Sequence, residues 1–132
     1  VTSQLEQMIV LDALIANEDR HWGNFGALRN SESLEFIGLA PVFDNGNSLG
    51  YKAASVMRNR NADVSVAFNK THTLELKHVS AAMKVDWDGI MSHCMEIVEH
   101  RYNQLVEPEF GMDRAHMIGQ LIQERAKKLK IF

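Results

Sequence analysis

A single cysteine, Cys94, supplies all the thiol chemistry of this chain of 132 residues. One cysteine excludes an internal disulfide bond and a zinc site built from cysteines. Because the neighbours of Cys94 at helical spacing are apolar, we expect its thiol to be buried rather than reactive. The sequence gives no support for an oxidising compartment, and we therefore expect a cytoplasmic location.

Long apolar runs and an excess of one charge are also missing. No apolar stretch approaches the roughly 18 residues that a membrane-spanning helix needs, and the N-terminal residues lack the features of a signal peptide. The net charge of −3 provides no general attraction to nucleic acid or to an anionic membrane, so we expect neither partner. The length of 132 residues fits one domain, and an apolar content of 45% is ordinary for a soluble globular domain. Because the first residue is not Met, we expect a fragment of a longer protein.

The apolar pattern predicts a mostly α-helical chain that contains one small β-hairpin. Residues 5–15 place most apolar side chains at steps of three and four, which is typical of an amphipathic helix. Ser3 and Glu6 have the S-x-x-E spacing of a capping box, so we expect this helix to begin near Ser3. Its periodicity ends at the polar segment N-E-D-R-H-W-G-N, which favours a structured loop.

A hairpin and two further helices are predicted after this loop. Residues 25–28 and 34–39 are expected to be strands, the second ending at Pro41, which cannot donate a ladder hydrogen bond. Asp86 is a suitable N-cap for one helix, and the last helix is expected to begin near Asp113. One face of the first of these helices carries Ile90, Cys94, Ile97, Val98, Arg101 and Leu105, and the inner stripe of the last carries Ile118, Leu121, Ile122, Arg125 and Leu129.

The most informative polar residues flank the hairpin. Asp19 and Asn24 bound the segment D-R-H-W-G-N, and Asp44 lies in A-P-V-F-D-N-G. An aspartate, an asparagine five residues later and a second aspartate is the order that kinases use. Phosphoryl transfer needs a carboxylate at the attacking hydroxyl and oxygen ligands for Mg²⁺. We therefore interpret Asp19 as the catalytic carboxylate and Asn24 and Asp44 as ligands of the Mg²⁺ that carries ATP.

Two residues inside the first segment have open roles. His21 is a candidate catalytic residue that orients Asp19 or contacts the transferring phosphate. A structural role, in which His21 holds the loop together by hydrogen bonds, is slightly favoured. Arg20 pairs with an acidic group or a phosphate in one interpretation and braces the loop or is solvated in the other.

At these residues the chain resembles the C-terminal lobe of the HipA-like kinases. The resemblance is strongest over L-D-A-L-I-A-N-E-D-R-H-W-G-N-F-G and L-A-P-V-F-D-N-G-N-S-L, within residues 11–49. This bacterial family of serine/threonine kinases is distantly related to eukaryotic protein kinases and often supplies the toxin of a toxin–antitoxin pair. The resemblance implies that residues 1–132 form a kinase C-terminal lobe, with ATP and Mg²⁺, a protein substrate and, in toxin members, an antitoxin as partners.

Carried over by position, the resemblance implies that Asp19 is the catalytic aspartate, Asn24 the Mg²⁺ ligand of the loop and Asp44 the counterpart of the D-F-G aspartate. Gly46 matches the glycine of D-F-G, but Asn45 stands where that motif has phenylalanine. The chain also lacks a glycine-rich strand–turn–strand and a strand lysine, the parts that clamp the phosphates of ATP. We therefore expect the chain alone to bind ATP weakly and to transfer phosphate poorly.

Two alternative functions remain open from the sequence. A non-catalytic, pseudokinase-like or partner-binding helical module would use the three polar residues to brace loops. A phosphoinositide-kinase-like phosphotransferase is the other alternative, because D-R-H-x-x-N also resembles the catalytic loop of those enzymes. Residues 45–73 occupy the place of an activation or substrate loop in one interpretation and form a solvated flexible loop in the other. In the activation-loop interpretation the candidate phosphosites are Ser48 and Ser55 and the candidate phosphate-binding cations are Lys52, Arg58 and Arg60.

Overall fold

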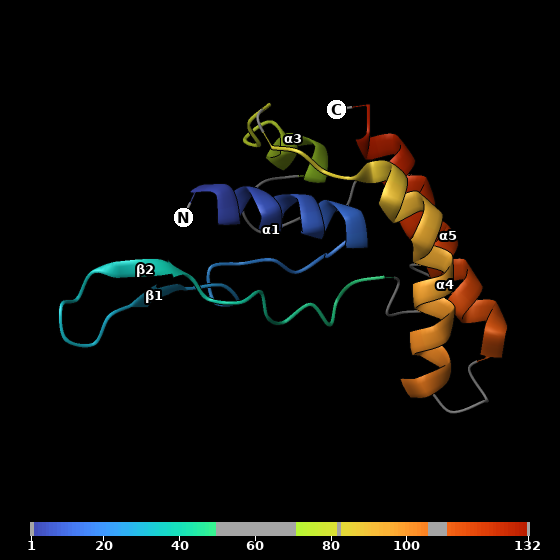
Figure 1. Cartoon of the computed structure of the whole chain (residues 1–132), viewed down its shortest axis with the longest axis horizontal. Coiled ribbons are helices and arrows are strands. Elements are labelled where there is room, and N and C mark those ends of the chain that lie inside the picture. The colour runs from blue at the N-terminus through green and yellow to red at the C-terminus, as the bar shows by residue number, and fades with distance from the viewer. Residues whose placement is uncertain (1, 50–70, 82, 106–110, 132) are drawn as a thin grey trace. The chain divides into compact units, whose positions relative to one another are not determined.

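The computed structural model describes residues 2–49, 71–81, 83–105 and 111–131 (Figure 1). The chain divides into two compact units, one of Val1–Ser48 with Asp63–Met83 and one of Leu49–Ala62 with Lys84–Phe132. The described residues are mostly helical and contain a two-stranded antiparallel sheet, which confirms the secondary-structure class predicted from the sequence. Among them, no helix is long and apolar enough to cross a membrane.

Helix α1 (Thr2–Ile15) organises the first unit. It contacts α3 (His72–Leu76) and strand β2 (Phe36–Leu39), and it lies between them in Figure 1. It buries Met8, Val10, Asp12 and Ala13, which lie on more than one side of the helix, so a carboxylate is buried among apolar side chains. Burial of these residues against α3 and the hairpin, rather than helix propensity alone, stabilises a helix of this length.

The predicted capping box at the start of α1 is wrong. The helix begins at Thr2, so Ser3 lies inside it. The Glu6 side chain instead accepts hydrogen bonds from the Ser80 backbone N at 3.1 Å and the Ser80 hydroxyl at 3.3 Å. Glu6 therefore holds the segment after α3 against α1, a contact between residues far apart in the sequence.

Strands β1 (Ala27–Arg29) and β2 form the predicted hairpin, but each is shorter than expected. The Asn30 side chain delays the start of β2, because its oxygen accepts hydrogen bonds from Glu32 N at 2.8 Å and Ser33 N at 2.9 Å and so extends the turn. Strand β2 ends at Leu39, before Pro41, as predicted.

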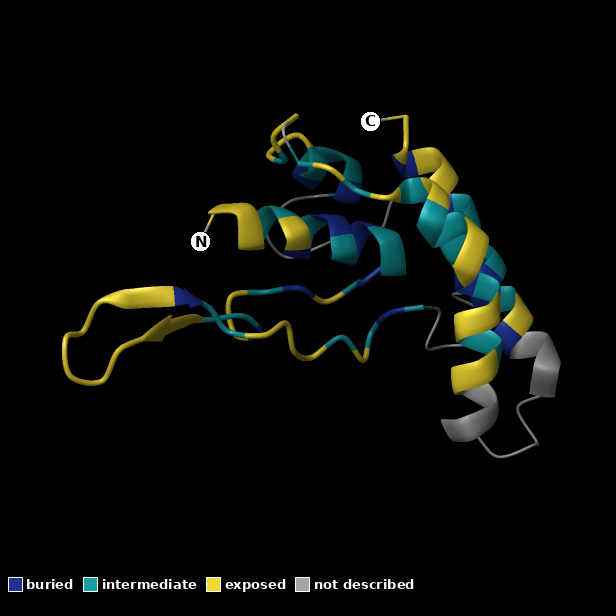
Figure 2. Cartoon of the chain, in the orientation of Figure 1, coloured by how far each residue is buried: buried dark blue, intermediate teal, exposed yellow. Residues whose placement is uncertain are grey.

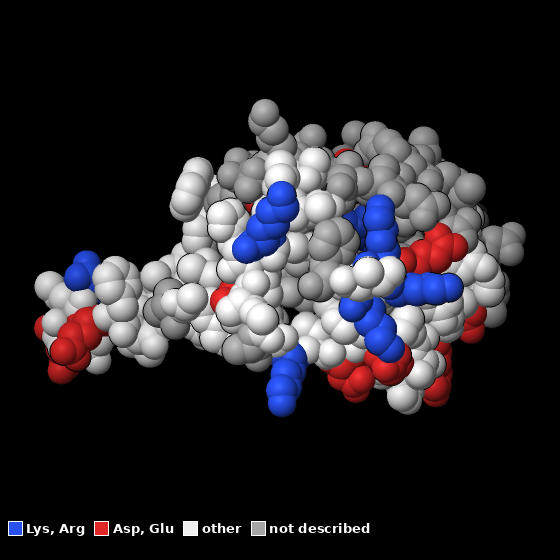
Figure 3. All heavy atoms as spheres, turned by 90° about the horizontal axis from the view of Figure 1, so that it is seen from above, with Lys and Arg blue, Asp and Glu red and all other residues white. Residues whose placement is uncertain are grey.

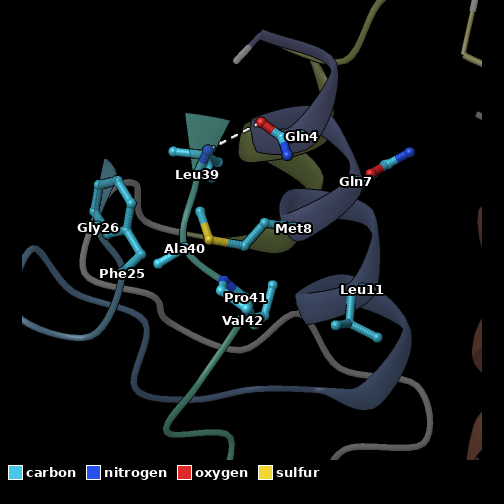
Figure 4. A pocket seen from close by; sticks show the side chains of 10 residues that line it. All are labelled: Gln4, Gln7, Met8, Leu11, Phe25, Gly26, Leu39, Ala40, Pro41 and Val42. Atoms are coloured by element: carbon cyan, nitrogen blue, oxygen red, sulfur yellow. Dashed lines mark hydrogen bonds between the residues drawn. The ribbon is translucent and has the colours of Figure 1, made fainter. Parts of the chain in front are cut away.

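The hairpin is exposed along most of its length, as the yellow colour of Figure 2 shows. Its end carries charges of both signs (Figure 3), contributed by the exposed Arg29, Glu32 and Glu35. At its base, Leu39 N donates to the Gln4 side chain at 3.0 Å, which ties β2 to α1 (Figure 4). A cavity of about 500 Å³ lies beside this bond.

Helix α3 is a feature that the sequence pattern did not predict. Thr71 caps it by accepting a hydrogen bond from Leu74 N at 3.3 Å, and its His72 and Glu75 are buried. The candidates Lys52, Ser55, Arg58 and Arg60 lie outside the described residues.

The second unit is an antiparallel pair of helices, α4 (Trp87–Leu105) and α5 (Gly111–Leu129). Asp86 caps α4 as predicted, because its carboxylate accepts a hydrogen bond from Gly89 N at 2.9 Å. The core of this unit includes Cys94, Ala115, Ile118, Leu121, Ala126 and Leu129. The expected inner stripe of α5 is confirmed at Ile118, Leu121, Arg125 and Leu129.

Two expectations for this unit are corrected. Ile97 is 58% exposed and Arg101 is also exposed, so the apolar face predicted for α4 is covered only in part. Helix α5 begins at Gly111 rather than near Asp113. The thiol of Cys94 is buried, as expected, and burial raises its pKa.

Candidate functional site

The candidate site is built on a buried ion pair between α1 and the loop that follows it. The Asp12 carboxylate accepts from Arg20 Nε at 2.8 Å and from Arg20 Nη2 at 2.9 Å, and both side chains are at most 1% exposed. Asn17 Nδ2 also donates to this carboxylate at 2.9 Å. A two-point guanidinium–carboxylate contact of this kind fixes direction as well as distance. Asp12 therefore sets where the loop leaves the helix.

Arg20 also holds the segment that follows β2. Its Nη1 donates to the backbone oxygens of Asn24 at 2.8 Å and Phe43 at 2.9 Å, and its Nη2 donates to the Asn45 side chain at 2.6 Å. With the two bonds to Asp12, all five N–H groups of the guanidinium are used. Arg20 therefore braces the loop through an acidic partner and has no N–H group left for a phosphate.

Asn24 closes the loop on itself. Its side-chain oxygen accepts from His21 N at 2.9 Å, and its Nδ2 donates to the Asp19 backbone oxygen at 2.6 Å. The residue is 1% exposed. An amide oxygen has two lone pairs, so one acceptor position remains on Asn24 beside its bond to His21.

His21 contributes to the same turn. Its ring Nδ1 accepts a hydrogen bond from Gly23 N at 3.0 Å, and its backbone oxygen accepts from Asn24 N at 3.1 Å. In this arrangement a neutral ring carries its proton on Nε2. These contacts match the loop-bracing interpretation of His21.

The Asp19 carboxylate is exposed, while its surroundings are held in place. Asp19 N donates to the Asn17 side chain at 3.1 Å, and Asp19 Oδ2 accepts from Asn47 Nδ2 at 3.0 Å. The backbone makes a second link to the same residue, because Glu18 N donates to Asn47 O at 3.0 Å. The loop of Asp19 is thus joined directly to the segment that carries Asp44.

Asp44 is exposed and has a φ of 55°, in the left-handed region that residues other than glycine adopt rarely. Its neighbours explain how this conformation is held. Phe43 O on one side and the Asn45 side chain on the other both accept hydrogen bonds from Arg20. One buried guanidinium therefore holds the residue on each side of Asp44, Phe43 through its backbone and Asn45 through its side chain.

The donor set suits Mg²⁺. Asp44 presents an exposed carboxylate, and the amide oxygen of Asn24 keeps one acceptor position beside its bond to His21 N. In the part of the chain that the structure describes, no group of three His, Cys, Asp or Glu side chains is placed to hold a metal. Mg²⁺ needs no such cage, because it keeps several waters and is commonly bound by one or two carboxylates together with substrate phosphates.

Sequence reasoning missed the residues that support this site, namely Asp12, Asn17, Asn45 and Asn47. Asp12 left a signal, because a carboxylate at an inward position of an apolar helix needs a buried partner. The asparagines looked like ordinary turn residues, and nothing in their spacing indicated which side chains they would contact.

The comparisons with known proteins indicate a relationship to serine/threonine kinases over a short stretch. The chain is 48% identical over 50 residues to the serine/threonine-protein kinase CtkA of Helicobacter pylori strain J99. This match covers 38% of the chain and 15% of that kinase. No family model matches the chain, and no solved structure matches it. A kinase-type phosphotransferase is the class that this similarity supports.

Proposed function

We propose that this chain contributes the catalytic carboxylate and the Mg²⁺ ligands of an ATP-dependent kinase of the HipA-like type, acting on a protein serine or threonine. The observation that carries the proposal is the double link between the Asp19 loop and the Asp44 segment, through Arg20 and Asn47. The similarity to a serine/threonine kinase supports the same class. The kinase C-terminal lobe as the fold of residues 1–132 is part of this proposal.

The residues divide the work by their exposure and chemistry. Asp19 has an exposed carboxylate, which suits contact with a substrate hydroxyl and acceptance of its proton. Asp44 has an exposed carboxylate and Asn24 a free amide lone pair, which suit Mg²⁺. When Mg²⁺ is bound with ATP, it would neutralise part of the negative charge of the phosphates. His21 has its ring nitrogen engaged within the loop, so we assign it to positioning this turn.

Asp19→Asn and Asp44→Asn in the full-length protein test the proposal. With Mg²⁺-ATP and a general protein acceptor, each variant is expected to lose at least about 100-fold in phosphate transfer. Glu35→Gln, a similar change on the exposed hairpin, is the matched control and keeps full activity. Wild-type transfer rates in both Asp variants would refute the proposal. Phosphatidylinositol vesicles as a second acceptor distinguish a protein kinase from a lipid kinase.

One observation favours a non-catalytic module as the second candidate. Both polar atoms of the Asn24 side chain already bond within the loop, and the residue is almost fully buried. Asn24→Ala separates the two functions. A kinase loses Mg²⁺-ATP affinity by more than its loss of stability explains, whereas a module loses stability and has no Mg²⁺-ATP affinity to lose. Calorimetric titration of the wild-type full-length protein with Mg²⁺-ATP is the first measurement.

The biological setting is proposed from the resemblance to HipA-like kinases. It comprises a bacterial cytoplasm and an antitoxin partner. Expression of the full-length protein in a bacterium is expected to arrest growth, and Asp44→Asn is expected to relieve the arrest. Normal growth with an active kinase would contradict the toxin role and leave the kinase assignment standing.

A further inference from the structure

We propose that Asn47 is a positioning residue that holds the Asp19 carboxylate in the orientation that receives the substrate hydroxyl. This inference rests on the proposed catalytic role of Asp19. Asn47 Nδ2 donates to Asp19 Oδ2 at 3.0 Å, and the two residues are 28 positions apart in the sequence. Within the described residues, no other hydrogen bond to this carboxylate is present.

An exposed aspartate with no partner samples several rotamers, and only some of them point a given oxygen at a substrate. Holding one oxygen through the Asn47 amide restricts these rotamers and leaves the other oxygen, Oδ1, available. Orientation of a reacting group before the reaction lowers the barrier because the entropy has already been lost. Asn47 is therefore placed to affect the rate of transfer rather than the binding of ATP.

Asn47 is itself anchored, which a positioning residue requires. Its backbone oxygen accepts a hydrogen bond from Glu18 N at 3.0 Å, so Asn47 contacts the Asp19 loop through both its main chain and its side chain. Two positions earlier, the Asn45 side chain accepts from the buried Arg20 at 2.6 Å. The segment that carries Asp44 thus contributes the hydrogen bond that orients Asp19, and one connected set of bonds holds the Asp19 carboxylate and the two neighbours of Asp44.

The chemistry of an amide suits this task. A neutral N–H donor directs the carboxylate without an ion pair, so the charge of Asp19 is not neutralised by its own support. A lysine at this position would hold the carboxylate as a salt bridge and compete with its work as a proton acceptor. An aspartate at position 47 would have no donor and would repel Asp19.

Asn47→Asp in the full-length kinase is the sharpest test. The substitution keeps the size of the side chain and the backbone bond to Glu18, and it replaces the donor by a repelling carboxylate. We expect kcat to fall roughly 10- to 100-fold while KM for ATP stays within about twofold. The kcat of the Asn47→Ala variant is expected to fall less, because this substitution removes the donor without adding repulsion. Asn30→Asp, the same chemical change in the exposed hairpin turn, is the matched control and leaves kcat unchanged.

The outcomes separate this inference from the proposed function. Loss of activity in Asp19→Asn with wild-type kcat in both Asn47 variants would overturn the inference alone. Full activity in Asp19→Asn would overturn the catalytic role of Asp19 and the inference with it. A rise in KM for ATP equal to the fall in kcat would also overturn the positioning role, since it indicates a distorted nucleotide site. If Asn47→Asp does not fold, Asn47→Ala carries the same test through its kcat and KM.

Discussion

Arg20 and Asp12 form a buried two-point ion pair across eight residues of sequence, with Nε to Oδ2 at 2.8 Å and Nη2 to Oδ1 at 2.9 Å. The same guanidinium reaches Phe43 and Asn45 on either side of Asp44. Helix α1 and both proposed catalytic segments therefore depend on one side chain. The sequence left open a phosphate contact for Arg20, which follows Asp19, and the hydrogen bonds of its guanidinium exclude that use.

Asp12→Ala is expected to destabilise the first unit strongly. Removal of one partner leaves the Arg20 charge buried without compensation, which costs about 3–5 kcal/mol. Urea unfolding followed by circular dichroism measures the loss. Asp88→Ala is the control, because its ion pair with Lys130 is exposed on both sides and contributes at most about 1 kcal/mol. Equal losses of unfolding free energy in the two variants would show that the buried Asp12–Arg20 pair stabilises the protein no more than the exposed pair does.

Arg20→Lys tests whether the fork of the guanidinium, and not its charge alone, holds the site. A lysine has three donors, so at least two of the present acceptors lose their partner. We expect a loss of roughly 2–4 kcal/mol from unmade buried hydrogen bonds. Arg29→Lys on the exposed hairpin changes stability little. A fully stable and active Arg20→Lys protein would contradict the bracing role.

Asp44→Gly and Asp44→Ala separate backbone strain from chemistry. The φ of 55° suits glycine and strains alanine, so we expect the glycine variant to be more stable by about 1 kcal/mol. Both variants lose the carboxylate, and both are expected to be inactive in phosphate transfer. Thermal melting gives the first quantity and the kinase assay the second. A less stable glycine variant would argue against the left-handed conformation at this position.

Gly119→Ala tests the close approach of α4 and α5. A Cβ at Gly119 overlaps the Met95 sulfur and lies 3.4 Å from the Met95 Cα. We expect a loss of about 1–3 kcal/mol from overpacking, measured by thermal or urea unfolding. Gly26→Ala is the matched control, since a Cβ there meets no atom within 4 Å. A neutral Gly119→Ala would mean that Met95 moves aside without cost.

The Cys94 thiol is expected to react slowly while the chain is folded. Burial raises its pKa, so less thiolate forms at a given pH, and the side chain is also covered. Because the unfolded chain loses this proton at lower pH than the folded chain, stability falls as pH rises into the alkaline range. Alkylation rates with and without urea, and urea melts across this range, measure both effects. Rapid alkylation of the native protein would contradict a buried thiol.

Local patterns determined much of this fold. Helices α1, α4 and α5 follow from apolar periodicity, and Asp86 caps α4 because its side chain reaches an amide three residues away. The hairpin and the order of Asp19, Asn24 and Asp44 could also be recognised from the sequence. These features depend on residues that are close together in the sequence, so they can be predicted from one sequence. The capping box predicted at Ser3 was wrong because the helix begins one residue earlier, at Thr2, which places Ser3 inside it.

The tertiary structure alone decided how the polar residues are used. Arg20 became a brace because Phe43 and Asn45, 23 and 25 positions away, supply its acceptors. Asn47 became the partner of Asp19 for the same reason, across 28 positions. A sequence shows which groups can donate and accept hydrogen bonds. Which of them meet depends on how the hairpin returns the chain to the end of α1, since a buried donor bonds to whichever acceptor the fold brings within reach.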